Sequence, residues 1–73
     1  MAAYKATNIR LGQLLDSHNM TAPDLAERVH VSRRSMYNYV KGYRPLPIDV
    51  AYSIAQYFGV TIESLYDWVL VEA

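Results

Sequence analysis

Five polar side chains between residues 33 and 41 have the spacing of one helix face. On a helix that turns by about 100° per residue, all five fall within an arc of roughly 140°. They are Arg33, Arg34, Tyr37, Asn38 and Lys41. Arginine can bridge the O6 and N7 atoms of guanine, and asparagine can pair with N6 and N7 of adenine. Met36, Tyr39 and Val40 fall on a separate apolar arc that we expect to face the core. This segment therefore presents a face whose chemistry fits the major groove of DNA.

The charges are balanced overall but uneven along the chain. Seven basic and seven acidic residues give a formal net charge of zero, which taken alone argues against a nucleic-acid-binding protein. Residues 28 to 48 hold five of the basic residues and no acidic one, whereas residues 45 to 73 contain no lysine or arginine. The local field matters more than the sum when a polyanion docks on one face. Lys41, Tyr43 and Arg44 are the candidates for contacts to the DNA backbone.

Five helical segments are expected to position this face, separated by capping and turn signals. They cover residues 7–18, 21–29, 32–41, 48–58 and a short stretch from 61 to about 68. Thr21 and Asp24 have the spacing of a capping box, Ser32 suits the N-cap of the third helix, and Gly42 suits its end. The pattern predicts an all-α fold with a helix-turn-helix at the second and third helices, joined by a tight turn at His30 and Val31.

The buried faces follow from the same periodicity. Leu11, Leu14, Leu15 and His18 share one face of the first helix, with His18 at the edge of the core. The fourth helix is expected to bury five residues within a narrow arc: Ile48, Ala51, Ile54, Ala55 and Phe58. Residues 68–71 show no usable periodicity and fit either the end of a helix or a strand-like tail. We expect one domain over residues 1–73, with a core of about 7–67 and a tail at 68–73 that could serve dimerisation or partner binding.

Several other chemistries find no support in the sequence. Without cysteine there is no disulfide framework, and the two histidines do not have the spacing of a metal site. No apolar stretch approaches the roughly 20 residues of a membrane span, and no signal peptide is recognisable. The triplet Asp16-Ser17-His18 cannot converge on one substrate, because consecutive helical residues point in different directions. We expect no enzyme activity, no cofactor, no small-molecule substrate, no membrane contact and a cytoplasmic location.

The chain resembles the Cro/lambda-repressor (XRE) family of helix-turn-helix regulators. The resemblance runs from about Leu11 to Leu65 and rests on residues 20–21, 24–27, 31–33, Gly42, Pro45 and 58–62. It implies a compact five-helix domain whose third helix enters the major groove of double-stranded DNA, and homodimers on half-sites about one DNA turn apart. It also implies which residues read the DNA sequence: Ser32, Arg33, Arg34, Tyr37 and Asn38. To these we add Thr21, at the start of the second helix, as a further DNA-contact candidate.

Two positions depart from that family. Ala22 stands where a phosphate-contacting glutamine is common, and His30 stands where the turn often has glycine. The resemblance implies that Ala26 is the alanine of the second helix that lets the third helix pack closely across it.

Two functions remain open from the sequence. The first is a stand-alone transcriptional regulator of the Cro or phage-repressor type that occupies an operator. The second is a protein-interaction module on the same fold, such as an antirepressor or an antitoxin-like partner of another regulator. An exposed apolar patch often marks a protein interface. The candidates for such an interface with a second copy or a regulatory partner are Tyr52, Tyr57, Trp68, Val69 and Leu70.

Overall fold

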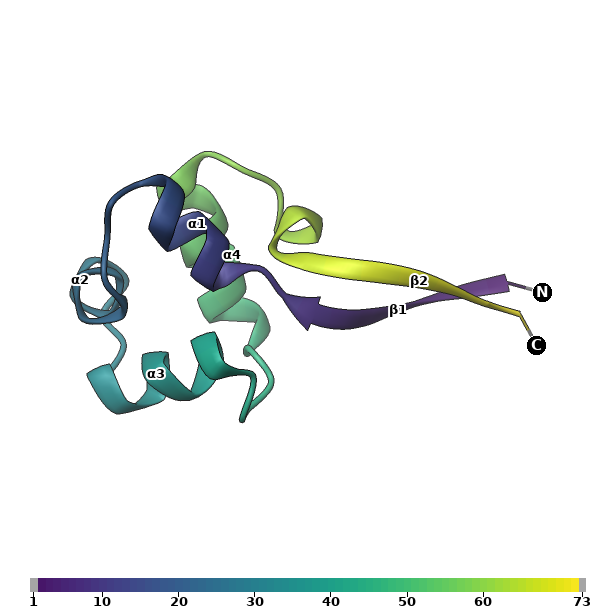
Figure 1. Cartoon of the computed structure of the whole chain (residues 1–73), viewed down its shortest axis with the longest axis horizontal. Helices are drawn as coiled ribbons and strands as arrows, with labels where there is room; N and C mark the ends of the chain where they lie inside the picture. Colours follow the sequence, from purple (N-terminus) through teal and green to yellow (C-terminus); the bar gives the residue numbers. More distant parts are fainter. Residues whose placement is uncertain (1, 73) are drawn as a thin grey trace.

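The computed structural model describes residues 2–72 as a small helical body from which a two-stranded ribbon projects (Figure 1). The body contains four α-helices, α1 (Leu11–Ser17), α2 (Ala22–Arg28), α3 (Arg33–Lys41) and α4 (Ile48–Phe58), and the 3₁₀ helix η1 (Ile62–Leu65). The ribbon pairs β1 (Ala2–Ile9) with β2 (Tyr66–Glu72) in antiparallel orientation. None of the helices within residues 2–72 has the length and apolar character to cross a membrane.

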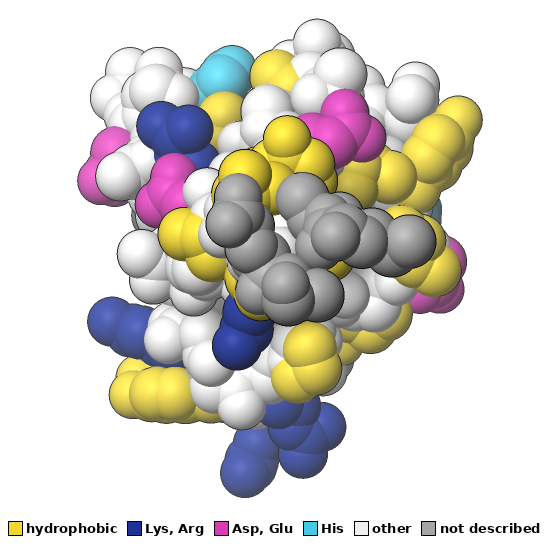
Figure 2. Space-filling model, turned by 90° about the vertical axis from the view of Figure 1, so that its right-hand side faces the viewer, with side chains coloured by type: hydrophobic (Ala, Val, Ile, Leu, Met, Phe, Trp, Pro, Cys, Tyr) yellow, Lys and Arg dark blue, Asp and Glu magenta, His cyan; other side chains and the backbone are white. Residues whose placement is uncertain are grey.

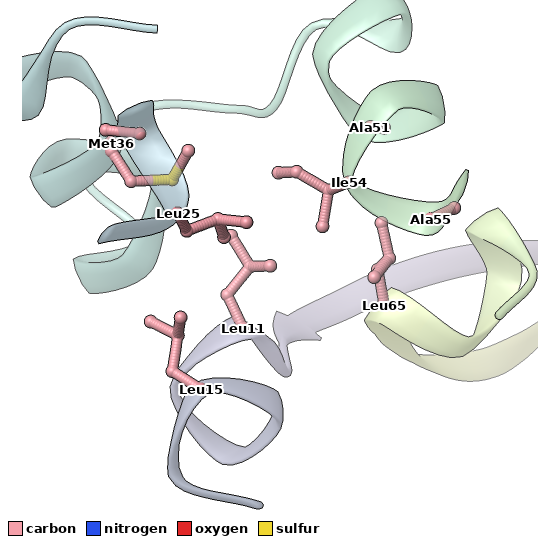
Figure 3. Packing of buried hydrophobic residues seen from close by; sticks show 9 residues of the cluster. Leu11, Leu15, Leu25, Met36, Ala51, Ile54, Ala55 and Leu65 are labelled. Atoms are coloured by element: carbon pink, nitrogen blue, oxygen red, sulfur yellow. The ribbon is translucent and has the colours of Figure 1, made fainter. Parts of the chain in front are cut away.

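The core is built from one fully buried side chain of each helical segment. These side chains point toward one another in Figure 3 and each is 0% exposed: Leu11, Leu25, Met36, Ile54 and Leu65. Leu15, Ala26, Ala51 and Ala55 complete the cluster, and the structure records no buried polar or charged side chain among the described residues. Because this core holds α2 and α3 against α1 and α4, it fixes the direction in which the outer face of α3 points.

The first helix is shorter than predicted. The sequence pattern predicted a helix over residues 7–18, but α1 begins at Leu11, and residues 7–9 belong to β1. Asn8 pairs with Asp67 and Ile9 with Tyr66, and a bulge between Ala6 and Asn8 shifts the register. The backbone hydrogen bonds of these residues are satisfied across the ribbon rather than along a helix, so tertiary pairing decides the conformation here.

The predicted fifth helix is largely wrong. Only residues 62–65 are helical, as the single 3₁₀ turn of η1, and the chain then continues as β2. Tyr66, Trp68, Val69 and Val71 are aromatic or β-branched, which favours a strand once a partner is present. The fold is therefore mostly helical with a small two-stranded sheet, and the predicted all-α five-helix architecture is corrected. Of the two conformations left open for residues 68–71, the strand is the one observed.

The base of the ribbon is tied to the helical body. The backbone N–H of Arg10 donates to the carbonyl oxygen of Leu65 at 2.7 Å, and the indole N–H of Trp68 donates to the carbonyl oxygen of Glu63 at 2.7 Å. The side chains of Arg10 and Asp67 add an ion pair with an N···O distance of 3.7 Å. Beyond this base the ribbon leaves the body, which gives the molecule its elongated shape of 41 × 23 × 20 Å.

Candidate nucleic-acid interface

Local capping sets where α2 and α3 begin. The hydroxyl oxygen of Thr21 accepts from the backbone N–H of Asp24 at 3.3 Å, and the Asp24 carboxylate accepts from the Thr21 N–H at 3.1 Å. This is the predicted capping box. At the start of α3 the Ser32 hydroxyl oxygen accepts from the N–H of Ser35 at 3.1 Å. The Ser32 hydroxyl is exposed and can donate its O–H to a phosphate at the N-terminus of α3.

A tight turn joins the two helices. The backbone N–H of Val31 donates to the carbonyl oxygen of Ala26 at 2.9 Å, and the Ala26 side chain is only 1% exposed. The small side chain at this position lets α2 and α3 pack closely, as the resemblance implied. His30 within the turn has a φ of 58°, in the left-handed region that favours glycine. A side chain at this position therefore strains the backbone of the turn.

Replacing His30 by glycine should stabilise the domain by about 0.5–1 kcal/mol, because glycine adopts a positive φ without the Cβ clash. Asn19 also has a positive φ, of 54°, but asparagine tolerates this region better, so Asn19→Gly should change stability less. Urea unfolding of the two variants and the native chain measures the difference. Equal or lower stability for His30→Gly would show that the turn is not strained.

Asp24 makes the stability of this segment dependent on pH. The hydrogen bond from the Thr21 backbone N–H is the largest cause that holds the pKa of Asp24 below its ordinary value of 3.8, and the Thr21 hydroxyl acts in the same direction. The charges of Arg28 and Arg33 lower this pKa further, and partial desolvation opposes them. The Asp24 carboxylate therefore binds a proton less readily in the folded state than in the unfolded state.

The stabilisation from Asp24 should be present above pH 3.8 and be lost as the pH falls through the lower pKa of the folded state. Asp24→Asn should therefore lower the urea midpoint at neutral pH and have little effect at a pH well below 3.8. Thr21→Ala removes the hydroxyl partner and should weaken the same pH dependence. If Asp24→Asn lowers the urea midpoint by the same amount at every pH, the stabilisation does not come from the charged carboxylate of Asp24.

The two faces of α3 separate as the periodicity predicted. Met36 is fully buried, and Tyr39 and Val40 are half-buried against the core cluster. Arg33, Arg34, Tyr37 and Lys41 are exposed, and Asn38 is half-buried. The helix ends at Gly42, whose φ is 78°. The outer face of α3 thus presents two guanidinium groups, a phenol and an ammonium group to solvent.

Aromatic contacts organise the end of this face. The rings of Tyr37 and Tyr43 meet edge to face with centroids 6.2 Å apart, and the Lys41 Nζ lies 5.7 Å from the Tyr37 centroid. The backbone N–H of Tyr43 donates to the carbonyl oxygen of Asn38 at 2.9 Å, which turns the chain back over the end of α3. Tyr43 and Lys41 are therefore held beside the outer face of α3 rather than extending freely into solvent.

The basic side chains of this region are not neutralised within the part of the chain that the structure describes. Over residues 2–72 the ion pair recorded is Arg10 with Asp67, at the base of the ribbon. Arg33, Arg34, Lys41 and Arg44 are exposed and available to phosphates. In Figure 2 dark blue side chains gather at the lower end, where α3 lies in Figure 1, and magenta acidic side chains lie above them. The basic residues from the middle of the sequence therefore lie together at one end of the molecule.

The predicted interface residues lie in two separate places. Tyr52 and Tyr57 are exposed on α4, and Tyr57 lines a hollow with Asp24, Glu27 and Arg28 of α2. Trp68, Val69 and Leu70 are exposed on β2. The sequence reasoning missed that β1 brings Tyr4 beside them, opposite Leu70. It also placed Ile48 in the core, whereas its side chain is 73% exposed and lines an open groove between α4 and the ribbon.

These features define a class of protein. Two short helices joined by a tight turn, with one face of the second buried and the other basic and exposed, form a helix-turn-helix domain. A family model described as the Cro/C1-type HTH DNA-binding domain matches residues 10–70, and the chain belongs to this family.

Two curated proteins are similar to the chain. An uncharacterized HTH-type transcriptional regulator of Methanocaldococcus jannaschii is 39% identical over 49 residues, which cover 67% of this chain and 74% of that protein. An SPbeta prophage-derived uncharacterized HTH-type transcriptional regulator of Bacillus subtilis is 30% identical over 66 residues, or 89% of this chain and 82% of that protein. No solved structure gives a significant match. With its fold and family, the chain is a DNA-binding transcriptional regulator.

Proposed function

We propose that this regulator occupies an operator in double-stranded DNA by inserting α3 into the major groove. The observation that carries the proposal is the division of α3 into a buried apolar face at Met36 and an exposed face with Arg33, Arg34 and Tyr37. The N-terminus of α3, where the Ser32 hydroxyl caps the N–H of Ser35, offers the backbone N–H groups of Arg33 and Arg34 to a phosphate beside the groove. The action proposed is binding, without a chemical reaction.

Each predicted site residue has a proposed role. Arg33 and Arg34 read base edges, with guanine O6 and N7 as the best matched acceptors, and Asn38 contributes an amide that can pair with adenine. Tyr37 offers its ring to a thymine methyl group or to a sugar. The remaining candidates contact the backbone and fix the register of the domain: Thr21, Ser32, Lys41, Tyr43 and Arg44.

The proposed regulator acts as a homodimer. A single domain of this size reaches few base pairs, so useful affinity and specificity require two half-sites. A two-fold symmetric pair would bind a palindromic operator whose half-sites are about one DNA turn apart.

Selection from a pool of random duplexes tests this function directly. The chain should enrich a palindromic motif, and fluorescence anisotropy should show binding that weakens steeply between about 50 and about 200 mM salt, because phosphate contacts release counterions. No enrichment, together with no binding at the lower salt, would contradict the proposal.

A second candidate function is supported by a separate observation. The ribbon carries four exposed large apolar side chains on β2, from Trp68 to Val71, while the net charge of the chain is zero. An antirepressor or antitoxin-like module would use such a surface to bind another regulator. That role predicts loss of the partner when Trp68 is replaced, and no change when Arg33 is replaced.

A further inference from the structure

The open groove between α4 and the ribbon has the composition of a small-molecule pocket. Its volume is about 620 Å³, and small-molecule sites usually have volumes of about 300–1,000 Å³. Most of the lining is apolar or aromatic, with Leu46 and Ile48 on the side of α4 and Trp68 on the side of the ribbon. Pockets of this kind combine apolar walls with a few polar groups that orient the ligand. The polar groups of the lining therefore indicate the class of ligand.

The charge of the groove comes from Arg44. It is the one charged residue among the described residues that line the groove, and none of them is acidic. Within residues 2–72 the ion pair recorded joins Arg10 to Asp67, so the guanidinium group of Arg44 has no carboxylate partner in this part of the chain. A guanidinium group beside an apolar wall complements a ligand that has an apolar body and one negative group.

The aromatic wall of the groove is held in place by contacts within the chain. The indole N–H of Trp68 donates to the carbonyl oxygen of Glu63 at 2.7 Å, and the Trp68 and Tyr66 rings meet edge to face with centroids 5.8 Å apart. Burial raises the pKa of the Tyr66 phenol above its ordinary value of 10.0, so Tyr66 keeps a proton that it can donate to an anion. Because these rings are already ordered, a flat ligand would bind here with little further loss of side-chain entropy.

We propose that this groove binds a small aromatic carboxylate. The ring of the ligand lies against Trp68 and the aliphatic side chains of Leu46 and Ile48, and its carboxylate pairs with the guanidinium group of Arg44. Arginine can offer two parallel N–H donors to a carboxylate. A phosphate would bring a second negative charge, for which the described lining holds no second basic group. An aliphatic acid would meet the same arginine but would lose the contacts between rings.

A ligand in this groove would compete with DNA for Arg44. Tyr39 and Gly42, at the end of α3, line the same groove, so the pocket borders the segment with the proposed phosphate contacts. A carboxylate paired with Arg44 removes one of these contacts, and ligand and operator then weaken each other's binding by the same factor. This regulation of DNA binding rests on the proposed function, whereas binding of the ligand to the groove does not. The two are therefore measured separately.

An NMR titration of the isotope-labelled full chain with naphthoate, without DNA, tests the groove. We expect saturable shifts at Leu46, at Ile48 and at the indole N–H of Trp68, with a dissociation constant between about 10 µM and about 2 mM. Naphthamide has the same rings and a similar shape but no charge, so it should bind at least about fivefold more weakly. No saturable shift at these groups, or equal affinities for the two probes, would overturn the proposal.

Three variants locate the bound probe. Arg44→Gln should weaken naphthoate by about 5- to 20-fold and leave naphthamide unchanged, because only the charged probe uses the guanidinium group. Ile48→Glu should weaken naphthoate at least about fivefold by repelling its carboxylate. Ile48 is 73% exposed at the start of α4, where an acidic side chain favours the helix, so this variant should fold. Gln56→Glu adds the same charge two turns farther along α4 and should change naphthoate binding less than about twofold. Equal losses for both glutamate variants would overturn the assignment to this groove.

Fluorescence anisotropy with the selected operator duplex tests the regulation. Saturating naphthoate should raise the dissociation constant of the operator complex by about 3- to 10-fold, the loss expected for one phosphate contact. Acetate at the same concentration controls for ionic strength and should have little effect. Naphthoate that binds the groove and leaves operator affinity unchanged would overturn the regulation. A chain that binds naphthoate in the groove but no DNA would support the ligand site and contradict the proposed function instead.

Discussion

Replacing Arg33 by alanine should reduce affinity for the selected operator duplex by about 10- to 100-fold, the loss expected for a bidentate contact to a base. Arg34→Ala should have an effect of the same order. Arg33→Lys keeps the charge but loses the planar pair of donors. Compared with Arg33→Ala, it should therefore restore affinity for a scrambled duplex more than affinity for the operator. Fluorescence anisotropy with the operator and a scrambled duplex separates these two components.

Arg10 provides the matched control for the arginines of α3. It is also exposed, but its guanidinium group pairs with Asp67 at the base of the ribbon. Arg10→Ala should change operator affinity by less than about twofold, since it removes the same net charge away from the proposed groove contact. Equal losses for Arg10→Ala and Arg33→Ala would indicate that net charge, rather than the face of α3, determines binding.

Replacing Ile54 by alanine should lower the free energy of unfolding by about 2–5 kcal/mol, the usual range for a large aliphatic side chain in a core. Ile54 is 0% exposed and packs at the centre of the cluster shown in Figure 3. A domain of this size has a total stability of about 4–11 kcal/mol. The substitution should therefore remove a large fraction of the total stability and lower the urea midpoint, and DNA binding should fall only by the fraction of the chain that becomes unfolded.

Ile48 offers a control within the same helix. Its side chain is 73% exposed, so Ile48→Ala should change the stability of the monomer by less than about 0.5 kcal/mol. Urea unfolding at a protein concentration too low for dimerisation compares the two isoleucines under the same conditions. A similar loss of stability in both variants would mean that the start of α4 contributes to the core, contrary to the structure.

The sequence predicted the helix-turn-helix well because its signals are local. The capping box of Thr21 and Asp24, the Ser32 cap and the Gly42 terminus each act within a few residues, and the structure contains all of them. The outer face of α3 was also predictable, since 3.6-residue periodicity alone separates Arg33 and Arg34 from Met36. The DNA-contact roles assigned to these side chains remain predictions.

The ribbon could not be predicted from the same signals. The partner of Ile9 is Tyr66, and the partner of Ala6 is Trp68, so each strand depends on a segment at the far end of the chain. Local patterns instead favoured a longer first helix and a fifth helix. The groove beside Ile48 was missed for the same reason, because one of its walls exists only after β1 and β2 pair. Hydrophobic periodicity shows which residues share a helix face, but it does not show whether another element covers that face.

An NMR titration of the isotope-labelled chain with the selected operator duplex tests the DNA-binding role of α3 most directly. The largest changes in amide chemical shift should fall at Thr21 and over residues 32–44, with smaller changes in the core of α4. Such a pattern would place the second helix of the helix-turn-helix against DNA without any substitution. Binding that leaves residues 32–44 unchanged and perturbs another surface would contradict the proposed major-groove role of α3.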